Sequence, residues 1–389
     1  MQRILSIIAL NVVIFIALIG LLEIFVRLNE NFGWLQKEEL SPYIVKPYLS
    51  TDDVKKKYGP LEIPTNYKAE HAYNWAELRQ AKYKSEFSQA TYPNHYYSEF
   101  LRKTNFSGQQ VSVMAQTNKS HVPIYTVTYD FDENGLRKVE QSLQNKYSEY
   151  FIALGCSLTF GEGVPSGFDY PSQLATKARN NIRIYNYGFH GAGPNDFYQA
   201  IKEDKKFFSA IKEKTGIAAW LFIPDHLERF FCSTNCQASR SWILDKPNLE
   251  LVDHNIIYRT KFKDSYTPRR VFYRFLSSFH LLNYFNFILP LEYSKENIEL
   301  FVKTFLVIKK DLEEKHQLQR FIFINYLQFP QQKMFVDALR SSGIEVLDYS
   351  DIPFSALSTH FQIPIDRHNT SEFNWLLTEM LAQDLNLKN

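Results

Sequence analysis

The sequence predicts an α/β fold of three layers, in which a parallel five-stranded sheet of flavodoxin-like strand order lies between two layers of helices. Short apolar runs alternate with helical stretches in the second half of the chain, at Tyr150–Leu154, Ile182–Tyr187, Ile217–Ile223, Phe321–Tyr326 and Ile344–Leu347. Such alternation is typical of parallel sheets, whose strands are buried on both faces. A chain of 389 residues that is 45% hydrophobic is long enough to bury this domain and an accessory region.

The N-terminal residues predict a transmembrane anchor within residues 1–30. The segment Ile4–Val26 is apolar, with Asn11 and Glu23 as its polar interruptions, and as a helix it would span about 30 Å of hydrocarbon. It ends without the small residues of a signal-peptide cleavage site, so we expect it to be retained. The positive charges on its two sides barely differ, and they leave the orientation open.

Residues 31–145 predict a small accessory region that contains β-structure. One alternating run, Ile124–Phe131, is closed by a turn sequence that ends in Asn-Gly, which indicates a strand and a turn. Residues 146–389 then form the α/β domain, with an insertion at about 230–300 between its third and fourth strands. Within the insertion, Val271–Leu291 is too polar for a second membrane span. We expect it to be a packed helix, with a lid or a membrane-surface helix as the alternative.

The spacing of two cysteines favours a domain outside the cytoplasm. Cys232 and Cys236 could close a short disulfide in an oxidising compartment, with two free thiols or half of a metal site as alternatives. A zinc site needs about four ligands, and no second Cys/His pair of suitable spacing lies beside them. Cys156 has no obvious partner in the sequence. We therefore expect a single-pass membrane protein with an extracytoplasmic domain.

The charge balance argues against nucleic acid as a partner. The chain has 44 Lys and Arg against 42 Asp and Glu, a formal net charge of +2, which offers no basic footprint for phosphates. The membrane, through the N-terminal helix, is the partner that the sequence does predict.

A glycine-rich turn after the first predicted strand, GCSLTFGEG at residues 155–163, carries the main chemical signal. Ser157 lies just past the carboxyl end of that strand, where open α/β sheets bind their ligands. The glycines permit a tight turn and leave backbone N–H groups free to face an oxyanion. No Lys follows them as a Walker loop requires, and their spacing is not that of a dinucleotide fingerprint. A plain glycine-rich turn is the alternative to a nucleophile.

A base and its carboxylate partner are predicted near the C-terminus. His368 and Asp366 lie in a loop after the last predicted strand, which can bring His368 to the same sheet edge as Ser157. A serine nucleophile needs such a base and an orienting carboxylate. Residues two apart in extended structure point the same way, which suits this spacing. The other candidate bases, His190 and His226, have no similarly placed acid in the sequence.

These segments resemble the SGNH, or GDSL-like, hydrolase superfamily, in its branch with an N-terminal membrane anchor. The first block of the family is matched by GCS at residues 155–157, and the second by NYGFHG at 186–191. The letters of the third block recur as GPND at 193–196, but Asn195 and Asp196 there indicate the start of a helix. By position the third block is IPDH at 223–226, with Asp where the family has Asn.

The resemblance covers about residues 145–389 and implies a set of roles. Ser157 would be the nucleophile, His368 the base and Asp366 its partner, at a spacing one residue shorter than the common Asp-x-x-His. The oxyanion hole would consist of the N–H groups of Ser157 and Gly188 and the side chain of Asp225. A carboxylate donates no hydrogen bond unless it is protonated, so the last residue departs from the family pattern. The family chemistry needs no cofactor and no metal.

The resemblance further implies an esterase or an O-acyl transferase that works through an acyl-enzyme. The expected substrate is an extracytoplasmic acylated glycan or a lipid, because a membrane-anchored member would meet such molecules. The alternative is a catalytically silent module of the same fold that binds a glycan or a protein partner, and Asp225 favours this alternative.

Overall fold

The structure is a computed structural model, and it describes most of the chain beyond residue 120. The described residues are 17–26, 28, 49–68, 73, 82–88, 109–116, 121–142, 146–234, 236, 241–285, 288–358, 360–364 and 366–388.

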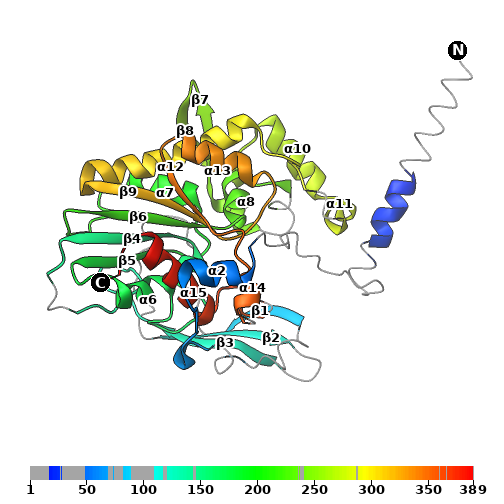
Figure 1. The fold of residues 1–389 in the computed structure, drawn as a ribbon. Helices are drawn as coiled ribbons and strands as arrows, with labels where there is room; N and C mark the ends of the chain where they lie inside the picture. The colour runs from blue at the N-terminus through cyan, green and yellow to red at the C-terminus, as the bar shows by residue number, and fades with distance from the viewer. Residues whose placement is uncertain are drawn as a thin grey trace, which may run out of the picture.

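A parallel five-stranded sheet forms the centre of the α/β domain. Its strands are β4 (Glu149–Gly155), β5 (Ile182–Gly188), β6 (Thr215–Phe222), β9 (Leu318–Asn325) and β10 (Glu345–Asp348). They lie in the order β10-β9-β6-β4-β5, and Figure 1 shows β9, β6, β4 and β5 from top to bottom. Each neighbouring pair is parallel. This is the flavodoxin-like order that the sequence predicts, and the five apolar runs supply the five strands.

Helices cover both faces of the sheet, because alternate residues of each strand point to opposite sides. On one face, Ile152 and Trp220 belong to a core that includes residues of α7 (Pro194–Glu203), α12 (Lys295–His316) and α13 (Gln332–Ser341). On the other face, Phe151 and Leu221 pack with residues of α2 (Thr51–Tyr58), α6 (Tyr170–Lys177) and α15 (Ser371–Asp384). The three layers are those expected.

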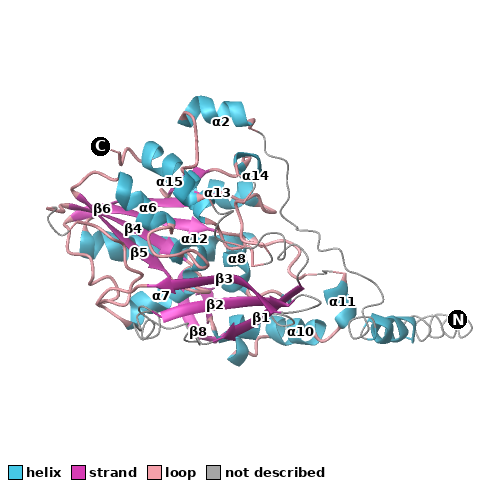
Figure 2. Ribbon diagram, turned by 90° about the horizontal axis from the view of Figure 1, so that it is seen from below, coloured by secondary structure: helices cyan, strands magenta, loops and turns pink. Residues whose placement is uncertain are grey.

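The accessory region contains a three-stranded antiparallel sheet. Its strands are β1 (Lys82–Ser88), β2 (Gln109–Gln116) and β3 (His121–Tyr129), in the order β1-β2-β3, and Figure 2 shows them side by side. The strand predicted at Ile124–Phe131 overlaps β3, which begins and ends earlier. The Asp132 carboxylate accepts hydrogen bonds from the N–H groups of Asn134 and Leu136, which fixes the turn that follows. A 3₁₀ helix, η1 (Thr65–Tyr67), precedes this sheet in the chain.

The insertion follows α8 (Asp225–Phe231) and contains a hairpin and short helices. In chain order these are η3 (Ser241–Asp245), β7 (Pro247–Val252), β8 (Asn255–Lys261), η4 (Phe262–Asp264), α10 (Pro268–Ser277) and α11 (His280–Tyr284). Val271–Leu291 is thus not the single packed helix that we expected, and Phe272 and Phe275 of α10 are more than half exposed. Cys232 and Cys236 form a disulfide, one of the alternatives that the sequence left open, and Cys156 is free and buried.

The predicted membrane anchor falls mostly outside the described residues. Residues 1–16 are not described, and residues 17–26 are helical. In the described part of the chain, no helix combines the length and the apolar character needed to cross a membrane. The N–H of Leu281 in α11 donates to the carboxylate of Glu23, and both figures show α11 beside this N-terminal helix.

Candidate active site

The candidate site lies where the sheet strands end, and the first strand leads directly into it. Strand β4 ends at Gly155, and Ser157 begins the four-residue helix α5 (Ser157–Phe160). Ser157 is only 4% exposed. In the part of the chain that the structure describes, the N–H of Ser157 has no acceptor, so this group is available to donate to a ligand.

Three side chains that are distant in the sequence meet at this edge. Ser157 Oγ lies 2.8 Å from Nε2 of His368, and Nδ1 of His368 lies 2.5 Å from Oδ2 of Asp366. Both nitrogens of the imidazole are therefore engaged, one by a hydroxyl and one by a carboxylate. This is the arrangement in which an imidazole can take the serine proton while the carboxylate orients the ring.

A tight turn, rather than extended backbone, brings Asp366 and His368 together. The N–H of Ile363 donates to the carbonyl of His368, and the N–H of Arg367 donates to the carbonyl of Ile363. Arg367 has a φ of 66°, in the left-handed region that non-glycine residues seldom adopt. The expected extended geometry is thus wrong, although the expected contact forms. The short spacing works because the chain reverses at Arg367.

Two glycines permit the close packing around α5. Gly161 ends the helix with a φ of 85°, and a Cβ there would lie 2.4 Å from Cβ of Asp169. At Gly188 a Cβ would lie 2.1 Å from the backbone nitrogen of Phe160, so any side chain would push β5 away from α5.

Gly188 does not offer the oxyanion donor that we expected. Its N–H donates to the side-chain oxygen of Asn186 at 2.9 Å, so the group is already occupied. The amide nitrogen of Asn186 in turn donates to the carbonyl of Thr159 in α5. The glycine therefore serves the packing of the site, and the prediction that it donates to an oxyanion has no support in this geometry.

Asp225 is the first residue of α8 and is paired with a cation. Its Oδ2 lies 3.7 Å from the guanidinium of Arg229, and about a third of its side chain is exposed. An ion pair favours the ionised carboxylate, which accepts hydrogen bonds and donates none. A donor role for Asp225 in an oxyanion hole is therefore not supported by its surroundings.

The GPND segment and His226 have structural roles. Asn195 and Asp196 lie in the first turn of α7, as the sequence indicated, and Asp196 accepts from the N–H of Gly193. His226 is fully buried and accepts from the indole N–H of Trp220. Burial, with the nearby cations, holds the pKa of His226 well below its ordinary value, so the ring is neutral.

A second carboxylate faces the catalytic candidates, and sequence reasoning missed it. Oε2 of Glu162 lies 2.7 Å from Nδ1 of His190 and 3.4 Å from Nε2 of His368. The hydroxyl of Tyr125, in β3, donates to Oε1 of Glu162. His190, which has no nearby acid in the sequence, is paired in the structure with an acid from the glycine-rich turn. The sequence signal that could have indicated this carboxylate is Glu162 itself, which stands between Gly161 and Gly163.

The charges of this cluster shift its titration. Burial lowers the pKa of His368, but the carboxylates of Asp366 and Glu162 outweigh this effect and raise the pKa to about 10. Burial disfavours the charged form of Glu162, yet the imidazoles of His368 and His190 lower its pKa below the usual range. The surrounding carboxylates therefore favour the protonated form of His368.

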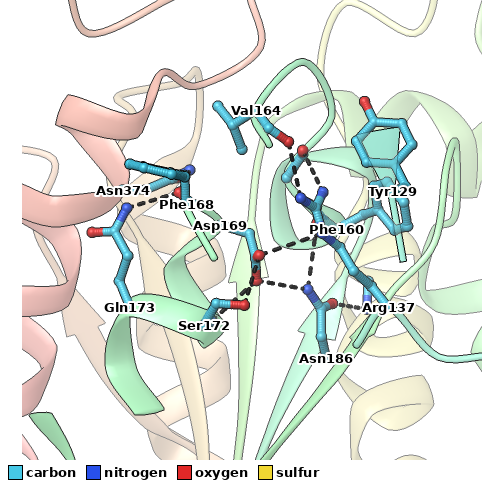
Figure 3. A network of polar contacts seen from close by, with 12 residues as sticks. Tyr129, Arg137, Phe160, Val164, Phe168, Asp169, Ser172, Gln173, Asn186 and Asn374 are labelled. Carbon is cyan, nitrogen blue, oxygen red and sulfur yellow. Dashed lines mark hydrogen bonds and ion pairs between the residues drawn. The ribbon is translucent and has the colours of Figure 1, made fainter. Parts of the chain in front are cut away.

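A buried arginine from the accessory region holds the glycine-rich turn. Arg137 donates to the carbonyls of Phe160, Gly161 and Val164, at 2.8, 2.6 and 2.9 Å. Its Nε lies 3.4 Å from Oδ2 of Asp169, the residue that caps α6. Figure 3 shows the guanidinium between these groups. Because Glu162 lies between Gly161 and Val164 in the chain, Arg137 holds the backbone on both sides of this residue.

The fold and these contacts define a class, the α/β proteins with a Ser–His–Asp constellation at the carboxyl edge of a parallel sheet. Neither a protein-family model nor a curated protein matches this chain. Among solved structures, the chain is similar to a member of the lipolytic G-D-S-L family from Veillonella parvula DSM 2008, with 13% identity over 61% of this chain and 97% of that one, and a TM-score of 0.33. It is also similar to an acetyl xylan esterase from the rumen bacterium Butyrivibrio proteoclasticus, with 10% identity over 64% and 67%, and a TM-score of 0.34. Likeness at this level supports no statement about activity, which we therefore infer from the site alone.

Proposed function

We propose that this protein is a serine-dependent esterase or O-acyl transferase that works through an acyl-enzyme on Ser157. One observation carries the proposal: the hydroxyl of Ser157, the imidazole of His368 and the carboxylate of Asp366 form one continuous chain of contacts of 2.8 and 2.5 Å. Both are hydrogen-bond distances, and the residues come from two segments of the domain that are far apart in the sequence.

The reaction has two halves that share one base. In the first half, His368 takes the proton of Ser157 as Oγ attacks the ester carbonyl, and it returns the proton to the departing alcohol. In the second half, water or another hydroxyl gives its proton to His368, attacks the acyl carbon and releases Ser157. Asp366 holds the ring and stabilises the imidazolium that forms at each step. The N–H of Ser157 is our candidate donor to the oxyanion.

We further propose that the domain acts outside the cytoplasm while the N-terminus is embedded in a membrane. The apolar segment Ile4–Val26 supports this proposal, and so do Leu18, Leu21 and Ile24, each more than half exposed in the helix of residues 17–26. Helix α11 contacts the helix of residues 17–26. Helix α10 directly precedes α11 and has exposed aromatic side chains, which would suit a position at the membrane surface. The substrate would then be an acylated glycan or a lipid at the membrane surface.

A catalytically silent module that binds a glycan or protein partner is the second candidate. It is favoured by the occupied N–H of Gly188 and by the ion pair of Asp225, which leave two of the three expected oxyanion donors unavailable. Such a protein would keep the contacts of Ser157 and His368 without turnover.

Active-site labelling of the full chain in detergent separates these two candidates. A fluorophosphonate probe should label the wild-type protein, p-nitrophenyl acetate should be hydrolysed, and Ser157→Ala should abolish both signals. Thr159→Ala, a change in the same helix at a residue that bonds a backbone carbonyl, is the matched control and should keep the label. A folded wild-type protein that takes up no probe and hydrolyses no ester would refute the enzyme and favour the binding module.

The membrane proposal has its own test. The protein should sediment with membranes after carbonate washing, and a protease added outside intact spheroplasts should digest the C-terminal domain. Release of the full-length protein by carbonate, or digestion only after the membrane is broken, would contradict this placement.

A further inference from the structure

The geometry points to a vicinal diol, as found in a sugar residue, as the acyl acceptor of this site, with Glu162 binding the hydroxyl next to the one that is acylated. The inference rests on the proposed function, because it concerns the second half of the same reaction. It begins from a carboxylate that the Ser–His–Asp chemistry does not use.

Glu162 lies where an acceptor must bind. Its Oε2 is 3.4 Å from Nε2 of His368, the nitrogen that also contacts Oγ of Ser157. The acceptor hydroxyl must give its proton to that nitrogen while it attacks the acyl carbon. Neighbouring hydroxyls of a vicinal diol are about 2.8 Å apart, a hydrogen-bond distance, so one can face His368 while the other faces Glu162.

The carboxylate is held in place but keeps acceptor capacity. Tyr125 donates to Oε1 and His190 contacts Oε2, which fixes the orientation of the group. An ionised carboxylate has about four acceptor positions, so these two contacts leave room for another donor. The side chain of Glu162 is 12% exposed and that of His368 is 19% exposed, so both groups present some surface to solvent.

The surrounding charge favours a neutral donor over a cation. Two imidazoles already lie against Glu162, and they lower its pKa because they compensate its charge. An ammonium group would also face His368, whose cationic form the carboxylates favour, and repulsion from it would offset the attraction to Glu162. A hydroxyl gains a hydrogen bond to a charged acceptor without that repulsion.

The transfer step balances without any further reactant. The first hydroxyl of the diol loses its proton to Nε2 of His368, and its oxygen bonds to the acyl carbon. The bond from that carbon to Oγ of Ser157 then breaks, and Oγ takes the proton from His368. The products are the diol monoester and the free serine. The second hydroxyl donates to Glu162 throughout and stays unchanged.

The test measures how one acyl-enzyme divides its acyl group between water and an added acceptor. The full-length protein in detergent, supplied with p-nitrophenyl acetate, is given propane-1,2-diol or propan-1-ol, which differ by one hydroxyl. We expect a transfer-to-hydrolysis ratio about tenfold higher for the diol, the effect of one hydrogen bond to a charged group. Equal ratios, apart from the factor of two for a second reactive hydroxyl, would overturn the inference.

Glu162→Gln should remove the preference for the diol, because the neutral amide is a weaker acceptor. Transfer and hydrolysis start from the same acyl-enzyme, so their ratio does not depend on the fraction of folded protein or on the basicity of His368. Glu299→Gln, which removes an exposed carboxylate on α12, is the matched control and should keep the preference. If Glu162→Gln cannot be purified, Tyr125→Phe should weaken the preference. A preference that survives the change at Glu162 would overturn the inference.

A cationic acceptor gives a further independent outcome. Choline and its neutral isostere 3,3-dimethylbutan-1-ol should be acylated at similar ratios, and a strong preference for choline would show a cation site and overturn the diol. A protein that forms no acyl-enzyme would overturn the proposed function and this inference together. Hydrolysis without preference for the diol would overturn this inference alone.

Discussion

The carboxylate of Asp366 lies 2.5 Å from Nδ1 of His368, although a single residue separates the two in the chain. The backbone turns back between them, with φ of 66° at Arg367, so the contact is made within one turn of six residues. The base therefore carries its own orienting acid on the same loop. The nucleophile, Ser157, comes from a distant segment of the sequence.

Asp366→Asn should lower kcat for p-nitrophenyl acetate by about 10³-fold or more. The amide can hold the ring but favours the wrong tautomer and cannot stabilise the imidazolium; in serine proteases the same change costs about 10⁴-fold. Steady-state hydrolysis measures the effect, with circular dichroism to show that the variant is folded. A loss smaller than about fivefold would mean that Asp366 has no part in the reaction.

The pH–rate profile should rise into the alkaline range and shift on mutation of Glu162. His368 must be neutral to act as base, and its pKa of about 10 means that kcat/KM increases with pH until that value is passed. Glu162→Gln removes an anion that stabilises the imidazolium, so the apparent pKa should fall and the profile should move toward lower pH. A profile that is flat from pH 7 to 10, or one that moves toward higher pH in the variant, would contradict this prediction.

Arg137→Lys should destabilise the protein by about 3 kcal/mol or more. A Lys cannot donate to three carbonyls at once, and it leaves Asp169 and the turn carbonyls in a buried site without their partner. Urea denaturation gives the change in the free energy of unfolding. Arg259→Lys, in an exposed ion pair of the β7–β8 hairpin, should cost less than about 0.5 kcal/mol. Similar costs for the two variants would refute the structural role of Arg137.

Asp225→Asn should raise the rate of ester hydrolysis by about tenfold. The amide can donate a hydrogen bond where the carboxylate cannot, and one such donor is worth about 10²-fold in other hydrolases. Initial rates with p-nitrophenyl acetate measure it. A collapse of activity would show instead that the site uses the carboxylate or its pair with Arg229.

The disulfide between Cys232 and Cys236 should be present in protein isolated from cells. Alkylation under denaturing conditions followed by mass analysis should find only Cys156 free. Closing so short a loop contributes about 2 kcal/mol by the chain-entropy model, so Cys232→Ser with Cys236→Ser should lower the unfolding free energy by no more than that amount. Three alkylated cysteines would contradict both the disulfide and the extracytoplasmic location.

The order of the sheet was accessible from sequence because it depends on local patterns. Buried parallel strands are nearly continuous runs of apolar residues, and β4, β5, β6, β9 and β10 each stand out from the amphipathic helices between them. The single packed helix expected at Val271–Leu291 of the insertion was wrong, since α10 has an apolar face that a sequence pattern alone assigns to a core.

The sequence alone determined which residues could act as nucleophile, base and acid, because Ser157, Asp366 and His368 each follow a recognisable strand and parallel strands bring their ends to one edge. Only the tertiary structure decided which neighbours modify them. Glu162 and His190 are 28 residues apart, and Arg137 reaches the glycine-rich turn from the segment that follows β3. Gly188 proved to be a packing residue whose N–H is occupied. Contacts of this kind depend on how separate segments of the chain pack together, so a local sequence pattern does not indicate them.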